Sequence, residues 1–186
     1  MGETTEPKVV EFDGCRVIGL QYAGKNEHGE IPALWGGETG FVARMGEVQS
    51  PPEAKYGDTG RHPVFGICRC LPERTDGAFE YVAGVVASAD APIPDGMIET
   101  RLSAGTHLAF SVQGLEQLSA VWGQAHTWLS EHPKWVGYCT GLKECDCANH
   151  PSFELYPPDF GIDGLMFIYL PVRAEGVGTP RQPLSS

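Results

Sequence analysis

The chain has 186 residues, of which 41% are hydrophobic, enough for one domain or two small fused modules with a real core. Its formal net charge is −11 and its 13 basic residues are scattered, which argues against nucleic acid as a partner because phosphates repel such a surface. The sequence shows no signal-peptide pattern and no apolar stretch long enough to span a bilayer, so we expect a cytoplasmic protein with no membrane partner.

The first half of the chain predicts a strand, a helix and two further strands. Residues 8–24 are an extended segment that we expect to break at Asp13-Gly14. Residues 31–46 favour a helix, although three internal glycines weaken it. Residues 64–71 and 78–87 are predicted to form two strands joined by a turn at 75–77. The expected helix has an apolar face of Ile31, Leu34, Trp35, Phe41, Val42 and Met45.

The second half predicts the same order. Residues 97–112 favour a long strand with a bulge or kink at Ala104-Gly105. Residues 115–129 have the cleanest helical spacing of apolar side chains in the chain. Two strands follow, at 152–156 and 165–171.

An internal repeat therefore organises the molecule. The two helices are expected to begin at residues 31 and 115, which are 84 apart, and the last strands near 79 and 164, which are 85 apart. We expect an α+β fold in which a strand-helix-strand-strand module is duplicated. Its antiparallel sheets, packed by the two helices, should form a pseudo-two-fold ligand groove between the halves. The predicted domain covers residues 8–172, with repeats 8–90 and 97–172 and a flexible tail at 173–186.

Several short motifs, in this order and spacing, carry a family resemblance over residues 8–172. They are IPALW in the first helix, VFGICRC and FEYVAGV on the next strands, IPDGM before the second repeat, and then LSAGTHLAF, PSFELY and IYLPV. Together they resemble the GyrI-like, or AraC-type effector-binding, domain family.

The resemblance implies both a fold and a range of functions. It implies a duplicated strand-helix-strand-strand module, as the repeat does. Family members include ligand-sensing domains of multidrug-responsive activators and stand-alone proteins linked to gyrase inhibition and toxin protection. Others resemble hydrolases that open the cyclopropane ring of DNA-alkylating natural products. Only a short tail precedes residue 8, so we expect a stand-alone member without a helix-turn-helix module.

The resemblance also points to one carboxylate. It places Glu154 as the acid of the binding pocket and Tyr169 as an aromatic residue beside it. Strand alternation puts Glu154 on one face with Ser152 and Tyr156. Some family sensors carry a second acid where this chain has Phe167, so the resemblance implies a less acidic pocket here.

A carboxylate among aromatic side chains is either protonated or paired with a cation. Aromatic faces attract a cation by ~0.5–2 kcal/mol per contact. The expected ligand is therefore a flat, hydrophobic aromatic molecule that can be cationic, bound without a cofactor. The predicted ligand-binding residues are Glu154, Tyr169, Trp35, Tyr81, Phe110, Trp122, Tyr138 and Phe167.

The same residues permit catalysis, so three hypotheses stand. The first is a binding protein that senses or sequesters a drug or toxin. The second is a cyclopropane hydrolase in which Glu154, Tyr138 or Tyr169 assists the attack of water, since a Glu with a raised pKa can transfer protons near neutral pH. The third is modulation of DNA gyrase through surface contacts.

The cysteines and histidines suggest a zinc site as the lesser alternative. Cys139, Cys145, Cys147 and His150 could form a four-ligand set. A Cys-x-Cys spacing is tighter than the usual zinc motif, so we expect reduced thiols and no metal. His62, His107 and His126 show no triad partners in the sequence, and we expect structural or surface roles for them.

Overall fold

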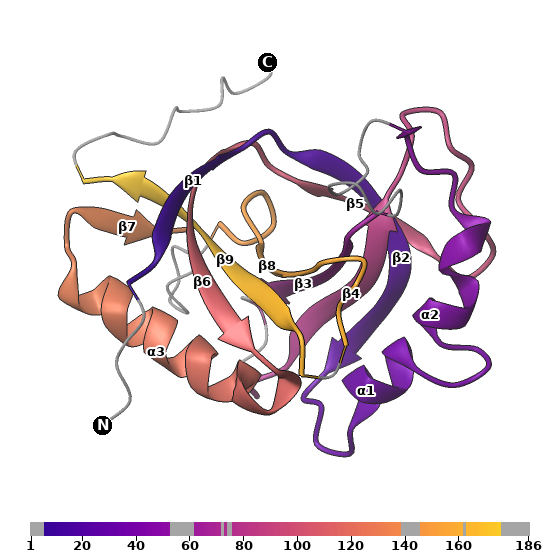
Figure 1. Ribbon diagram of the computed structural model, residues 1–186, viewed down its shortest axis with the longest axis horizontal. Coiled ribbons are helices and arrows are strands. Elements are labelled where there is room, and N and C mark those ends of the chain that lie inside the picture. The colour runs from indigo at the N-terminus through magenta and orange to yellow at the C-terminus, as the bar shows by residue number, and fades with distance from the viewer. Residues whose placement is uncertain are drawn as a thin grey trace.

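The computed structural model describes residues 6–52, 62–71, 73, 76–138, 146–161 and 163–175. One antiparallel sheet dominates this part of the chain and curls around the molecule (Figure 1). Its strands are β1 (Lys8–Phe12), β2 (Cys15–Gly24), β3 (Val64–Cys70), β4 (Phe79–Val86), β5 (Ile98–Leu102), β6 (Gly105–Gln113), β7 (Trp135–Gly137), β8 (Ser152–Tyr156) and β9 (Leu165–Ala174).

The strand order shows the duplication. It runs β1-β6-β9-β8-β3-β4-β2-β5, with β7 paired to β9 beside this path. The order reads symmetrically about the β8–β3 pair, because β1, β6, β9 and β8 stand in the positions of β5, β2, β4 and β3. In that central pair Gly66 lies directly opposite Glu154. The predicted α+β fold with a duplicated module is therefore confirmed.

Two helical regions cover the sheet, one from each half (Figure 1). The short helix α1 (Glu30–Trp35) packs on β2 and β4, and is followed by α2 (Phe41–Arg44) and the turn η1 (Met45–Glu47). The turn η4 (Leu115–Gln117) leads into α3 (Leu118–Glu131), which packs on β6. No helix in the described ranges is long and apolar enough to cross a membrane.

The helix expected over 31–46 is wrong as a single element, and the glycines explain why. The chain leaves α1 at Gly36, and Gly37 adopts a φ of 76°, a conformation that L side chains rarely adopt. At Gly40 the backbone passes so close to the Gly36 carbonyl that a side chain would overlap it. The segment therefore turns between two short helices.

Several strands also differ from prediction. The strand expected over 97–112 is interrupted after Leu102, so β5 and β6 pair with different partners. Strand β9 runs to Ala174, which takes in the first two residues of the expected tail, while residues 176–186 lie outside the described residues. The three-residue strand β7 was not predicted. The turn expected at 75–77 lies partly outside the described residues.

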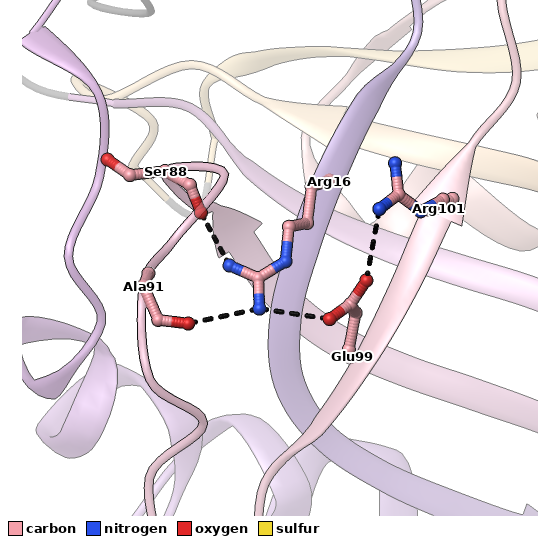
Figure 2. Close-up of polar contacts among 5 residues, drawn as sticks. All are labelled: Arg16, Ser88, Ala91, Glu99 and Arg101. Carbon is pink, nitrogen blue, oxygen red and sulfur yellow. Dashed lines mark hydrogen bonds and ion pairs between the residues drawn. The ribbon is translucent and has the colours of Figure 1, made fainter.

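Arg16 on β2 fixes the segment between β4 and β5, which joins the two halves (Figure 2). Its guanidinium donates to the carbonyls of Ser88 at 2.5 Å and Ala91 at 3.0 Å. It also forms a 2.9 Å ion pair with Glu99, and only 11% of its side chain is exposed. Arg101 approaches the other oxygen of Glu99 at 3.4 Å, but its side chain is 74% exposed.

Candidate ligand-binding site

A cavity of about 1750 Å³ opens between the two halves of the molecule. Binding pockets for drug-sized molecules usually measure about 300–1,000 Å³, so this one could hold a ligand with several rings. Its walls come from α1, α2 and β4 of the first half, from α3 and β8 of the second, and from β3 at the junction. The predicted groove at the seam thus corresponds to a real cavity.

Glu154 lies at the base of this cavity. It sits on β8, where all five residues are buried, and it is 4% exposed. Its Oε2 accepts hydrogen bonds from the hydroxyls of Tyr81 at 2.7 Å and Tyr156 at 2.8 Å. Its Oε1 accepts one from Trp122 Nε1 at 2.9 Å. Trp35 Nε1 in turn donates to the Tyr81 hydroxyl at 3.0 Å, so both halves hold the carboxylate.

Burial raises the pKa of Glu154, and the three hydrogen bonds from Trp122, Tyr81 and Tyr156 oppose that shift because they favour the anion. Burial and the nearby Glu154 charge raise the pKa values of Tyr81 and Tyr156. Both hydroxyls therefore keep their protons and act as donors at neutral pH.

Within the described part of the chain, the carboxylate has no cationic partner. Among the described residues that line the cavity, Glu154 is the only carboxylate and Arg69 the only Lys or Arg. The Arg69 guanidinium pairs with Glu80 at 2.6 Å and donates to the hydroxyl of Thr100. Three neutral donors hold Glu154 in place, and its charge remains available to a ligand.

Aromatic rings surround the carboxylate. The Trp35 and Tyr156 rings meet edge to face with centroids 5.2 Å apart, and Tyr156 contacts Phe160 in the same way at 5.1 Å. On α3 the rings of Trp122 and His126 stack with centroids 5.9 Å apart. These rings give the cavity flat apolar walls on which an aromatic molecule can lie.

Three of the predicted aromatic residues line the cavity: Trp35, Tyr81 and Trp122. Sequence reasoning missed Tyr156 as a site residue, although alternation already placed it on the face of Glu154. It also missed His126, which lines the cavity and whose pKa is lowered by burial.

Tyr169 and Phe167 lie on the other face of the sheet. In an antiparallel pair, residues directly opposite each other point to the same side. Tyr169 is opposite Phe153, Phe167 is opposite Leu155, and Glu154 is opposite Ile168. Tyr169 accordingly stacks on Phe153 with ring centroids 4.8 Å apart. The expectation that Tyr169 lies beside Glu154 is corrected by this register.

Phe110 and Tyr138 are also placed away from the cavity. Phe110 is 2% exposed and packs in the second core against Trp128, at a centroid distance of 6.1 Å. Tyr138 stacks on His150 at 3.8 Å. Neither residue is among those that line the cavity.

The predicted zinc set can be followed only in part. Cys139 and Cys145 lie outside the described residues, and Cys147 is disulfide-bonded, so the expectation of reduced thiols is wrong for Cys147. His150 approaches Ser103 Oγ at 3.0 Å and lies 3.8 Å from the Asp146 carboxylate. Within the described ranges no three His, Cys, Asp or Glu side chains are grouped to hold a metal ion.

Comparison with known proteins gives a family and a fold. A model of the GyrI-like small molecule binding domain matches residues 5–173. The transcriptional regulator BrlR of Pseudomonas aeruginosa is 29% identical over 109 residues, which cover 58% of this chain but only 35% of BrlR.

Solved structures share the architecture at low sequence identity. SAV2435 bound to tetraphenylphosphonium superposes with a TM-score of 0.60 and 14% identity, covering 91% of this chain and 94% of that one. A hydrolase from Listeria innocua superposes with a TM-score of 0.50 and 9% identity, covering 90% of this chain and 92% of that one. At these identities the likeness establishes the fold alone.

Proposed function

Because this chain belongs to the GyrI-like small molecule binding domain family, we propose that its cavity binds an aromatic, cationic drug-like or toxin-like molecule around Glu154. Binding would serve to sense or to sequester that molecule. A cytoplasmic location, predicted from the sequence, is part of this proposal. Modulation of DNA gyrase stays a prediction of the resemblance alone.

The observation that carries the proposal is the Glu154 carboxylate, 4% exposed and without a cationic partner among the described residues, in a cavity with aromatic walls. A buried charge without a counter-ion is costly. A cationic ligand would neutralise it, and the faces of Trp35, Trp122 and Tyr156 would add cation–π attraction. The ligand of SAV2435, tetraphenylphosphonium, has the same combination of charge and rings, which makes it a suitable probe.

Calorimetric titration with tetraphenylphosphonium tests the proposal. We expect the wild-type protein to bind one equivalent, and Glu154→Gln to bind at least about tenfold more weakly, because a hydrogen-bonded charge contributes about 1.5–3 kcal/mol. Since the amide fills the same space, the free energy of unfolding should change by about 1 kcal/mol or less.

The control is Glu131→Gln at the exposed end of α3. It also removes one negative charge, but at a residue that does not line the cavity. It should bind like the wild-type protein. Equal affinity of the wild-type and Glu154→Gln proteins would show that the cavity assignment is wrong.

One observation keeps hydrolysis as the second candidate. Tyr81 and Tyr156 both donate to the same oxygen of Glu154, so a carbonyl placed there would meet two hydroxyl groups beside a carboxylate. Water would attack a cyclopropane carbon while the ring bond from that carbon to the carbon beside the carbonyl breaks. The departing electron pair would pass to the adjoining carbonyl, which takes a proton from this cluster, and the attacking water would lose its own proton to the carboxylate. Tyr81 and Tyr156 replace Tyr138 and Tyr169 in this role.

Mass spectrometry separates the two candidates. After incubation with a cyclopropane-bearing aromatic compound, a binding protein returns the compound unchanged, whereas a hydrolase returns it with one water added. In the second case Glu154→Gln should slow turnover more than it weakens affinity. Recovery of unchanged compound from the wild-type protein would exclude hydrolysis of cyclopropane-bearing aromatic compounds as the function.

A further inference from the structure

Gly66 lies directly beneath the carboxylate cluster. It sits in the middle of β3, opposite Glu154 on β8 and Ala83 on β4. A Cβ atom built at Gly66 would overlap the Tyr81 hydroxyl and Glu154 Oε2. Gly66 is not among the glycines with a positive φ, so its backbone would accept other residues. The neighbouring side chains, not the backbone, require glycine here.

We infer that Gly66 is a positioning residue for Glu154: the space left by its missing side chain is where the Tyr81 hydroxyl reaches the carboxylate. With any side chain at this position, the Tyr81 hydroxyl and Glu154 Oε2 could not both keep their places over Gly66. The 2.7 Å hydrogen bond between them would then break. The consequence for ligand affinity rests on the proposed function, but the geometry does not.

The position of Gly66 in the duplicated fold explains its effect. Gly66 and Glu154 face each other in the central strand pair, so one half supplies the carboxylate and the other the space that it fills. Each half also directs one indole N–H to this point. Trp122 donates to the carboxylate directly, and Trp35 donates through Tyr81. Gly66 thereby brings groups from both halves onto one anion.

Gly84 offers a matched control. It lies on β4, and a side chain there would meet Val17 and the Ile18 backbone, which belong to the core and do not line the cavity. Gly84→Ala therefore introduces a comparable crowding that should destabilise the fold without moving the Tyr81–Glu154 contact.

Titration of Glu154 in the ligand-free protein tests the inference. The carboxyl carbon of Glu154, followed by NMR, should report a higher pKa in Gly66→Ala and in Tyr81→Phe than in the wild type, because each loses a hydrogen bond to the anion. The double variant should resemble Tyr81→Phe, since both changes act on the same contact. Gly84→Ala should titrate like the wild type.

Each outcome is decisive. An unchanged or lower Glu154 pKa in Gly66→Ala, or fully additive shifts in the double variant, would overturn the inference. If Gly66→Ala does not fold, folding of the double variant supports the inference, because Tyr81→Phe removes the hydroxyl, which is the atom that the methyl group overlaps most. Failure of both variants to fold overturns it. Where the wild type binds tetraphenylphosphonium, Gly66→Ala should bind about tenfold or more weakly. Absence of binding in every variant would count against the proposed function only.

Discussion

Glu154 combines two features that seldom occur together: near-complete burial and, among the residues that the structure describes, the absence of a cationic partner. Two tyrosines and a tryptophan satisfy its oxygens, and these neutral donors stabilise the anion without cancelling its charge. A binding site for a cation needs this property, since an ion pair within the protein would compete with the ligand.

Ligand affinity should depend on pH through this residue. Burial raises the pKa of Glu154, so the carboxyl holds its proton at a higher pH than an ordinary Glu. A cation binds the anionic form, so its affinity should rise as pH rises through the raised pKa and fall below it. Calorimetry between about pH 4.5 and pH 8 should show this slope in the wild type and a weaker one in Glu154→Gln, whose cavity still holds His126. A wild-type profile as flat as that of the variant would contradict the account.

The stability of the ligand-free protein should show the opposite dependence. A folded-state pKa raised above the unfolded one means that the folded protein binds the proton more tightly. The contribution of Glu154 is therefore fully present below the unfolded pKa and is lost as pH rises through the folded pKa. Denaturant unfolding of Glu154→Gln beside the wild type isolates this contribution, and the relative stability of the wild type should decline as pH rises.

Residue-level prediction succeeded within strands and failed between them. Alternation along residues 152–156 correctly placed Glu154 and Tyr156 on one face. Alternation also puts Phe167 and Tyr169 on one face of their own strand, but it cannot tell which face of one strand matches which face of the next. That information lies in the register of β8 with β9, and a shift of one residue exchanges the two faces.

At the scale of the elements, the segment between β4 and β5 depends on one side chain. Arg16 satisfies two carbonyls of this segment and the carboxylate of Glu99 with little solvent exposure (Figure 2). Arg16→Met should lower the free energy of unfolding by about 2–4 kcal/mol, because it leaves two part-buried carbonyls without their donor and removes the ion pair with Glu99. Denaturant unfolding measures the loss.

Arg101 provides the comparison, since it contacts the same Glu99 from an exposed position. Arg101→Met should cost less than about 1 kcal/mol. Neither arginine lines the cavity, so neither change should alter ligand affinity. Equal losses of stability for the two variants would show that burial of the Arg16 network contributes nothing.

The elements with a clear apolar periodicity were the ones that the sequence predicted. Strands β3, β4 and β8 and the helix α3 carry clear periodicities and were found close to their observed bounds. The glycines around α1 marked its end, but helical spacing of Trp35 and Phe41 outweighed them in the prediction. Strand β7, with three residues, is too short for a pattern and forms only because it pairs with β9.

For the whole molecule, duplication explains where the cavity lies. Two copies of one module join along β3 and β8, and α1 and α3 lie on either side of that junction (Figure 1) and both contribute residues to the cavity. The duplicate spacing of the elements predicted this architecture. It could not predict that the junction would pair a glycine of one half with the glutamate of the other, because that pairing depends on the register of two strands far apart in the chain.

The four tryptophans offer the most direct test of the claim that this cavity binds an aromatic cation. Trp35 and Trp122 line it, whereas Trp128 packs in the second core and Trp135 lies on β7. In a proton–nitrogen NMR titration with tetraphenylphosphonium, the indole signals of Trp35 and Trp122 should shift and saturate together, while those of Trp128 and Trp135 stay in place. Shifts confined to Trp128 and Trp135, or no shift at saturating ligand, would contradict the account.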